Sequence, residues 1–129
     1  MQKSDAPGAL LFFSSVAAGI GVANHAAIAM AKGGVEGLVR ALAADFSASG
    51  LRVNAIAPGL MHTPATARML SSEASARAIS AQYPLGRHGE AHEAAALGAF
   101  LLSDDAAWIT GQVVGLDGGF QAVRPLVRG

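Results

Sequence analysis

Short apolar runs alternate with segments of helical spacing along this chain, and that alternation limits the folds open to it. Apolar runs bounded by turn residues predict buried strands, and three occur, over residues 9–16, 52–57 and 112–116. Segments with helical spacing occupy residues 25–47, 71–80 and 90–102. Strand–helix–strand order gives parallel strands joined by right-handed crossovers. The sequence therefore predicts an α/β fold, with a three-stranded parallel sheet and flanking helices.

The two longer helices carry further local signals. Asn24 is a suitable N-cap for the first of them, and Gly50 is suited to end it. Apolar residues recur on one face of that helix at three- and four-residue spacing, namely Ile28, Ala31, Val35, Leu38, Leu42 and Phe46. In the segment 90–102, the residues expected to point inward are Ala94, Leu97, Leu101 and Leu102.

Composition restricts the classes of partner. The chain has 129 residues, enough for one domain, with 52% apolar and 14% charged residues. Its 9 basic and 9 acidic residues form no long block, which argues against nucleic-acid and membrane-surface partners. The chain has no cysteine, so disulfide and thiol chemistry are excluded. We expect a cytoplasmic protein with no transmembrane segment.

Four motifs resemble one known family. They are Leu-Phe-Phe-Ser-Ser-Val-Ala-Ala-Gly (11–19), Ala-Lys-Gly-Gly-Val-Glu-Gly-Leu (31–38), Leu-Arg-Val-Asn-Ala-Ile-Ala-Pro-Gly (51–59) and Ile-Thr-Gly-Gln-Val-Val-Gly-Leu-Asp-Gly-Gly (109–119). Together they resemble the C-terminal half of a short-chain dehydrogenase/reductase. The resemblance implies a partial Rossmann-like fold and NAD or NADP as cofactor. We expect residues 1–129 to form a single truncated domain that lacks the family's N-terminal glycine-rich nucleotide-binding half.

The resemblance also implies catalytic positions. In the family, a serine holds the substrate carbonyl, a tyrosine transfers the proton, and a lysine one turn later binds the cofactor ribose. Ser15 and Lys32 match the serine and the lysine, whereas Ile28 stands at the tyrosine position. An isoleucine side chain cannot transfer a proton or donate to an oxyanion. The family's ordinary mechanism therefore lacks its proton donor in this chain.

A cofactor loop follows the second predicted strand. The stretch Pro58-Gly59-Leu60-Met61-His62-Thr63 matches the family loop that contacts the nicotinamide end of the cofactor. By this resemblance the cofactor-binding candidates are Lys32, Pro58, Gly59, Met61 and Thr63. The alternative is a plain turn after the strand, in which Thr63 caps a helix.

Two other side chains are candidates for acid–base chemistry. His25 lies three residues before Ile28 and seven before Lys32, spacings that share one helix face. Imidazole titrates near neutrality and can serve as acid or base, although a solvated histidine at a helix start is the simpler interpretation. Tyr83, the only tyrosine, is expected to be a packing or lid residue. The other histidines show no metal-ligand spacing, so no metal site is expected.

Three functions remain open. The chain is either a divergent family member that is inactive alone, or a subunit that completes or stabilises a partner chain of the same family. The third possibility is a redox-neutral acid–base enzyme, such as an isomerase or cyclase, that uses His25 and Ser15. An uncovered strand edge invites pairing with another chain, so we expect a homo-oligomer or a hetero-oligomer. The substrate is an unidentified small molecule.

Overall fold

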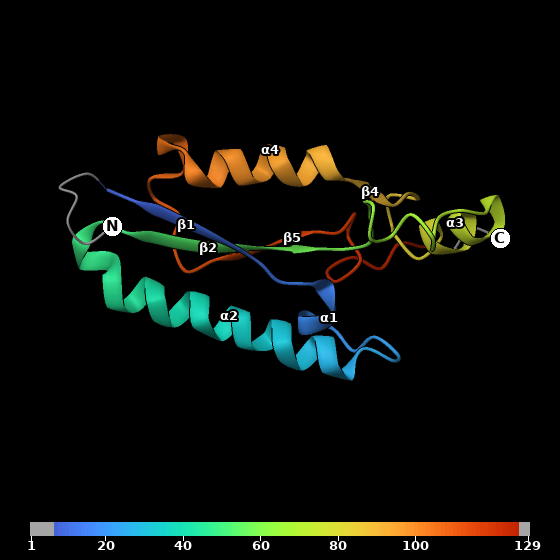
Figure 1. Cartoon of the computed structure of the whole chain (residues 1–129), viewed down its shortest axis with the longest axis horizontal. Helices are drawn as coiled ribbons and strands as arrows, with labels where there is room; N and C mark the ends of the chain where they lie inside the picture. The colour runs from blue at the N-terminus through green and yellow to red at the C-terminus, as the bar shows by residue number, and fades with distance from the viewer. Residues whose placement is uncertain (1–6, 127–129) are drawn as a thin grey trace.

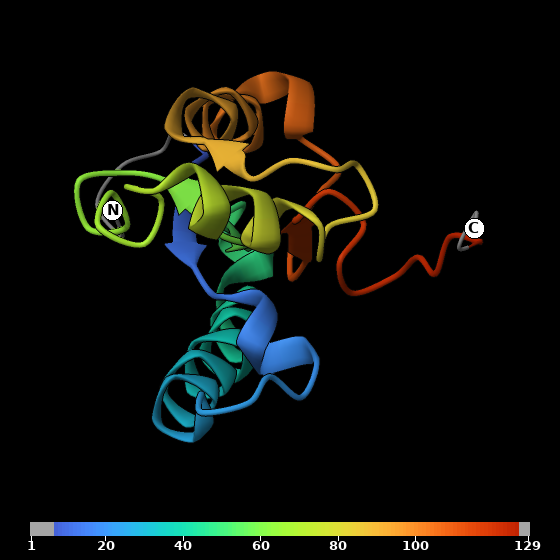
Figure 2. The ribbon, with the colours of Figure 1, turned by 90° about the vertical axis from the view of Figure 1, so that its right-hand side faces the viewer.

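The computed structural model describes residues 7–126, which form three layers. Helix α4 (Ala91–Leu102) covers one face of the central sheet, and α2 (Ala26–Phe46), together with the short α1 (Val16–Gly19), lies on the other (Figure 1). Seen along the sheet, the two helical layers stand on opposite sides of it (Figure 2). Both faces of the parallel sheet are thus covered, as this class of sheet requires.

The central sheet has the predicted parallel arrangement. Its strands β1 (Ala9–Phe13), β2 (Arg52–Pro58) and β5 (Val113–Leu116) lie in the order β1–β2–β5. Leu10 pairs with Val53, and Ile56 pairs with Val114, in the parallel register. The predicted α/β fold is confirmed, and within the described residues β1 is an edge strand.

Alternation along β2 divides the core between the two faces. Val53 and Ala55 are buried against Val39 and Ala43 of α2. Ile56 faces α4, where a Cβ placed on Gly98 would lie 3.0 Å from the Leu11 side chain and 3.9 Å from Ile56. The glycine thus permits α4 to approach the sheet closely.

Two polar side chains of β2 form hydrogen bonds to the end of α4 and to the segment before β5, at the end of the sheet opposite the candidate site. The Arg52 guanidinium donates to the carbonyl oxygens of Leu101, Ser103 and Ile109, at 2.9 to 3.2 Å. A cation at the end of α4 satisfies carbonyl groups that have no partner within the helix. Asn54, also buried, joins the same loop by accepting from the N–H of Gln112 and donating to Ile109.

The region around the first strand differs from the expectation. The strand ends at Phe13 rather than residue 16, because Ser15 caps the helical turn α1 by accepting from the N–H of Ala17. Asn24 is not the cap of α2: it adopts a left-handed conformation with φ 63°, which asparagine tolerates, and His25 occupies the N-cap position. Gly50, with φ 78°, ends the following turn as expected.

Two predicted helix faces are also partly wrong. The buried residues of α2 are Val39 and Ala43, whereas Ile28 and Leu38 are exposed. The buried stripe is therefore rotated from the predicted one, because apolar residues lie on more than one face of α2 and packing on the sheet selects one of these faces. In α4, Leu101 is buried as expected, but Leu102 is exposed.

The segment between β2 and α4 runs beside the sheet's carboxyl end. It contains β3 (Met61–His62), α3 (Glu73–Ser80) and β4 (Gly89–Glu90). The predicted short helix is confirmed as α3, which is capped by Ser72. Strands β3 and β4 form a two-residue parallel ladder. That ladder places the loop after β2 next to the start of α4.

Candidate functional site

Two serines follow β1, and their side chains have different hydrogen-bond partners. The Ser14 side chain is buried and donates a hydrogen bond to the Glu36 carboxylate of α2, at 2.6 Å. The Ser15 oxygen accepts from the N–H of Ala17 at 3.2 Å. Because a hydroxyl can donate as well as accept, the Ser15 hydrogen remains available to a ligand.

Lys32 reaches the same end of the sheet from α2. Its ammonium donates to the carbonyl oxygen of Phe13, at 2.9 Å. This side chain is therefore engaged within the protein and is not among the residues that line the neighbouring cleft.

A cleft of ≈ 620 Å³ lies at this carboxyl end of the sheet. Ser15, His25 and Ile28 come together in its wall with Pro58 and Gly59. The Ile28 side chain thus lines the same cleft as the candidate serine. The remaining lining residues come from α1, the loop after it, the loop after β2, α3 and the segments that follow: Val16, Ala17, Gly21, Val22, Ala23, Leu60, Met69, Ile79, Gln82, Tyr83 and Phe120.

His25 is oriented by the backbone. Its Nδ1 lies 2.7 Å from the carbonyl oxygen of Ala23. A carbonyl can only accept, so Nδ1 carries the hydrogen, and in neutral imidazole Nε2 then has a free lone pair. In this tautomer Nε2 is the ring nitrogen that can accept a hydrogen bond or a proton.

The loop after β2 uses most of its polar groups internally. The N–H of Thr63 donates to the Thr66 hydroxyl at 3.0 Å, and the two hydroxyl oxygens lie 3.1 Å apart. Thr66 also donates to the carbonyl oxygen of Met61. Met61 is buried, and neither Met61 nor Thr63 lines the cleft. The alternative role of Thr63 as a helix cap is wrong, because the next helix is capped by Ser72.

Tyr83 is fixed beneath this loop. Its hydroxyl oxygen accepts from the N–H of Leu60 at 2.7 Å, and its ring lies 5.2 Å from that of Phe120. A Cβ on Gly59 would stand 2.7 Å from the Tyr83 ring, so only glycine leaves room for it. Of the two predicted roles, packing is therefore the one the contacts support. Sequence reasoning did not find the contact with Leu60, although the glycine after β2 was a signal of close approach.

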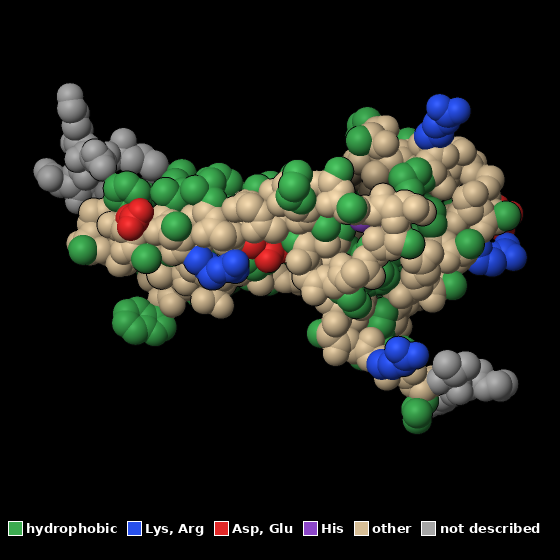
Figure 3. Space-filling model, turned by 90° about the horizontal axis from the view of Figure 1, so that it is seen from below, with side chains coloured by type: hydrophobic (Ala, Val, Ile, Leu, Met, Phe, Trp, Pro, Cys, Tyr) green, Lys and Arg blue, Asp and Glu red, His purple; other side chains and the backbone are tan. Residues whose placement is uncertain are grey.

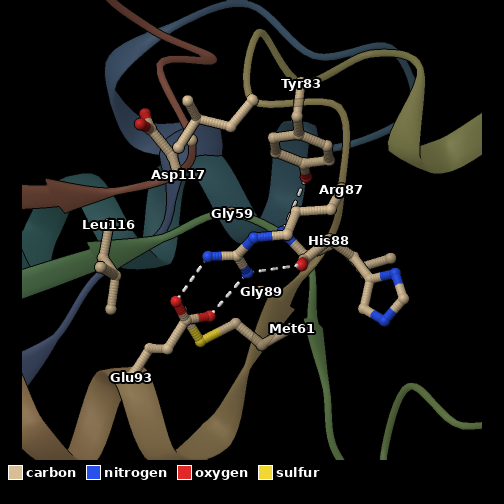
Figure 4. A pocket seen from close by; sticks show the side chains of 12 residues that line it. Gly59, Met61, Tyr83, Arg87, His88, Gly89, Glu93, Leu116 and Asp117 are labelled. Atoms are coloured by element: carbon tan, nitrogen blue, oxygen red, sulfur yellow. Dashed lines mark hydrogen bonds and ion pairs between the residues drawn. The ribbon is translucent and has the colours of Figure 1, made fainter.

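A smaller pocket of ≈ 110 Å³ lies on the other side of this loop, and Tyr83, Gly59 and Leu60 border both hollows. Figure 4 shows Arg87 reaching across it to Glu93, with distances of 2.6 and 2.8 Å between guanidinium nitrogens and carboxylate oxygens. The Arg87 hydrogen bond, followed by the backbone N–H of Glu90, lowers the pKa of Glu93 from 4.5 to about 2. The same hydrogen bond raises the pKa of Arg87.

Two histidines flank Glu90 near this pocket. His62 Nδ1 lies 3.7 Å and His88 Nε2 lies 3.5 Å from its carboxylate oxygens. Within residues 7–126, no group of three or more His, Cys, Asp or Glu side chains has the arrangement of a metal site.

No helix within residues 7–126 has the length and apolar character needed to cross a membrane.

Comparison with known proteins gives consistent matches. A family model described as enoyl-(acyl carrier protein) reductase matches residues 1–121. The chain is 39% identical, over 95% of its length and 50% of the relative's, to a 2,5-dichloro-2,5-cyclohexadiene-1,4-diol dehydrogenase of Sphingobium indicum. It is 40% identical, over 90% of its length and 52% of the relative's, to an inactive 2-(S)-hydroxypropyl-CoM dehydrogenase 2 of Xanthobacter autotrophicus.

A solved structure shares the same architecture. A short-chain type dehydrogenase/reductase from Mycobacterium ulcerans superposes with a TM-score of 0.85 at 36% identity, over 92% of this chain and 43% of that one. The chain thus spans about half the length of the proteins it matches.

Proposed function

This chain belongs to the short-chain dehydrogenase/reductase family, and we propose that it does not reduce carbonyl compounds by the tyrosine mechanism of that family. The observation that carries the proposal is the position of Ile28. It lies one helical turn before Lys32 and lines the cleft beside Ser15. The description of one relative as inactive supports the idea that members of the family lose catalysis.

The chemistry of reduction makes this substitution decisive. Hydride addition to a carbonyl carbon leaves charge on the oxygen, which a proton donor must neutralise. Ser15 can donate one hydrogen bond to that oxygen, but the alkyl side chain of Ile28 can supply neither a proton nor a hydrogen bond. The Lys32 ammonium is engaged with Phe13. We propose that the chain keeps a cleft for a substrate but lacks the side chain that would give a proton to the product oxygen.

Membership of the family implies NAD or NADP, and the residues present fit such a cofactor poorly. The N–H of Leu60 is taken by Tyr83 and that of Thr63 by Thr66, and one of the three N–H groups of the Lys32 ammonium is bound to Phe13. A nicotinamide group would have to displace these contacts. We therefore propose that these 129 residues bind it weakly, at its nicotinamide–ribose end alone.

Rate measurements test the main proposal. The wild-type chain is expected to stay at background with several ketones and either NADH or NADPH, at cofactor concentrations up to the millimolar range. Ile28→Tyr restores the missing phenol, and Ile28→Phe is the matched control that adds a ring without a hydroxyl. Turnover by the wild-type chain that Lys32→Ala abolishes would contradict the proposal.

A second function is favoured by the orientation of His25. Nδ1 is bound to Ala23, which leaves Nε2 as the basic ring nitrogen, and both His25 and Ser15 line the cleft. The test is exchange of the α-hydrogens of a ketone for deuterium in heavy water, followed by NMR. Exchange that His25→Gln removes supports this function, and exchange at the buffer rate contradicts it.

The role of a subunit remains a further proposal, supported by the edge of β1, which has no neighbouring strand among residues 7–126. A strand from a partner chain would satisfy the free backbone groups there. Copurification with a chain that carries a glycine-rich nucleotide-binding half, and the appearance of dinucleotide binding in the mixture, would support it.

A further inference from the structure

Two histidines lie on either side of one carboxylate between β2 and α4. His62 Nδ1 is 3.7 Å from one oxygen of Glu90, and His88 Nε2 is 3.5 Å from the other. The centroids of the two imidazole rings are 6.2 Å apart, and the rings meet edge to face. We refer to these three side chains as the His–Glu–His cluster.

The cluster lies where three segments meet. His62 and Glu90 are register partners in the parallel ladder of β3 and β4, which is two residues long. Ser80, the last residue of α3, has its hydroxyl oxygen 3.5 Å from Nδ1 of His88. The loop after β2, the end of α3 and the start of α4 are therefore joined by side chains of this cluster.

The ladder closes residues 63–88 into a loop. This loop carries α3 and four side chains that line the cleft, namely Met69, Ile79, Gln82 and Tyr83. At the ladder the N–H of Gly89 donates to the carbonyl oxygen of Leu60, at 2.9 Å. So short a ladder has little stability of its own, so interactions between side chains across it determine how often the loop opens.

The attraction within the cluster depends on pH. Distances of 3.5 and 3.7 Å are too long for strong hydrogen bonds, so the interaction is mainly Coulombic and requires a charged imidazole. Imidazole gains its charge as pH falls below about 6.5, whereas a glutamate is already ionised well above about pH 4.3. Both ion pairs therefore form in weakly acidic solution and are lost as pH rises toward about 8. The carboxylate between the two cations offsets their mutual repulsion.

The other charged groups around the cluster differ in whether they titrate in this range. The hydrogen bond and the charge of Glu93 raise the pKa of Arg87, and the charge of Glu90 adds a smaller contribution. Glu93 has a pKa of about 2, chiefly because of its hydrogen bond from Arg87. This pair therefore keeps its charges in weakly acidic and neutral solution. His92, on α4, acts on the charge of Glu93 and can titrate near neutrality, so it requires a control.

We propose that the His–Glu–His cluster makes closure of the loop 63–88 pH-dependent: protonated His62 and His88 hold the loop closed through Glu90, and the loop loosens when they lose these protons. The closed loop binds the two protons more tightly than the open loop, so the added stability is present below about pH 6.5 and is lost as pH rises through that value. Because the loop supplies part of the cleft wall, access to the cleft changes with pH in the same direction.

Amide hydrogen exchange tests the proposal on the whole chain. Exchange in heavy water is followed by NMR at about pH 5.5 and about pH 8, and is corrected for the intrinsic effect of pH on exchange. The Gly89 N–H reports on the ladder, and the Gly111 N–H, which donates to Val53 at the opposite end of the sheet, is the internal reference. Protection of Gly89 should fall about tenfold between the two pH values, since each partly exposed ion pair contributes about threefold. Protection of Gly111 should change less than about twofold.

Substitutions identify the groups responsible. Glu90→Gln keeps the shape of the side chain but removes the charge that both histidines face, so Gly89 should show the same low protection at both pH values. His62→Gln and His88→Gln should each leave a change of about threefold. His92→Gln removes a neighbouring imidazole outside the cluster and should keep the wild-type profile.

The wild-type profile decides the matter even where a variant folds poorly. Protection of Gly89 that is independent of pH would overturn the proposal. So would protection that changes in step with Gly111, because it would indicate unfolding of the whole chain. A wild-type profile in Glu90→Gln, or loss of the profile in His92→Gln, would overturn it as well. The proposal goes beyond the proposed function, and because no readout involves turnover, either can fail without the other.

Discussion

The Lys32 ammonium is hydrogen-bonded to the carbonyl oxygen of Phe13, with 2.9 Å between Nζ and O. Phe13 is the last residue of β1, and Lys32 lies in the second turn of α2. The contact therefore joins the long helix to the carboxyl end of the sheet, where the cleft begins. It also uses one of the three N–H donors of the ammonium that family resemblance assigns to the cofactor ribose.

We predict that Lys32→Met separates these two roles. The contact is partly exposed, so its loss should change the free energy of unfolding by less than about 1 kcal/mol. Binding of nicotinamide mononucleotide, expected in the millimolar range for the wild-type chain, should be lost. Denaturant unfolding and calorimetric titration check the two outcomes. Arg40→Met, on the same helix, is the control for removal of a cation, and nucleotide binding that survives in Lys32→Met but fails in Arg40→Met would contradict the assignment.

Gly59 is predicted to be intolerant of a methyl group. In Gly59→Ala the new Cβ would lie 2.7 Å from a ring carbon of Tyr83 and 3.3 Å from the Asp117 backbone. Overpacking against a fixed ring destabilises by about 1–3 kcal/mol. The control is Gly33→Ala in α2, where nothing lies within 4 Å. It should stabilise the protein by about 0.5–1 kcal/mol, since glycine is unfavourable inside a helix.

A double-variant cycle checks the cause. If the Tyr83 ring is the obstacle, Gly59→Ala should cost less in a Tyr83→Leu background than in the wild-type chain, because neighbouring substitutions are not additive. The free energies of unfolding of the single and double variants are measured by chemical denaturation. If the effects of the two substitutions simply add, the Tyr83 ring is not the obstacle to a methyl group at position 59.

The elements of the sheet could be predicted from sequence because each depends on a local pattern. The three apolar runs became β1, β2 and β5, and the helical spacing gave α2 and α4. The assignment of Ser15 and Ile28 to the family's serine and tyrosine positions came from the resemblance, and the structure places both residues in the lining of one cleft. The local patterns did not predict α1, because its Ser15 cap competes with continuation of the strand.

Contacts between distant segments were the part that sequence could not supply. Ser14 meets Glu36 across 22 positions, and Leu60 meets Tyr83 across 23. Neither pairing leaves a periodic signal, since each exists only after the sheet has formed. The hydrogen bond from Lys32 to Phe13 likewise joins segments that are distant in the sequence. The motif that contains Lys32 therefore did not predict this partner.

The Arg87–Glu93 pair predicts an acid-sensitive stability. The pKa of Glu93 is about 2 in the folded chain, against an ordinary value of 4.5. A lowered folded-state pKa means that the contribution is fully present above the ordinary value and is lost as pH falls toward 2. Between pH 4.5 and pH 2, the free energy of unfolding should therefore depend less on pH in Glu93→Gln than in the wild-type chain.

The control for this pH effect is Glu73→Gln. Glu73 pairs with Arg77 one turn along α3, with both side chains largely exposed, and such pairs contribute little. A pH profile that changes equally in both variants would assign the effect to general surface charge and not to the Arg87–Glu93 pair.

The outer face of α2 predicts an oligomer. Figure 3 views the molecule from this side and shows scattered apolar side chains on this part of the surface, with basic and acidic side chains among them. Met30 and Leu38 are 78% and 45% exposed, and Gly34 and Gly37 have open space where a Cβ would stand. Glycines lower helix stability without a compensating contact inside this chain, whereas a second helix could approach closely over them.

We therefore expect the protein to sediment as a dimer or larger species at micromolar concentration. Leu38→Glu should shift it toward the monomer, because a buried carboxylate without a partner opposes association. Ser75→Glu adds the same charge on α3, outside this face, and should leave the distribution unchanged. A wild-type chain that sediments as a well-behaved monomer would refute the assembly, and equal dissociation in both variants would place the contact away from α2.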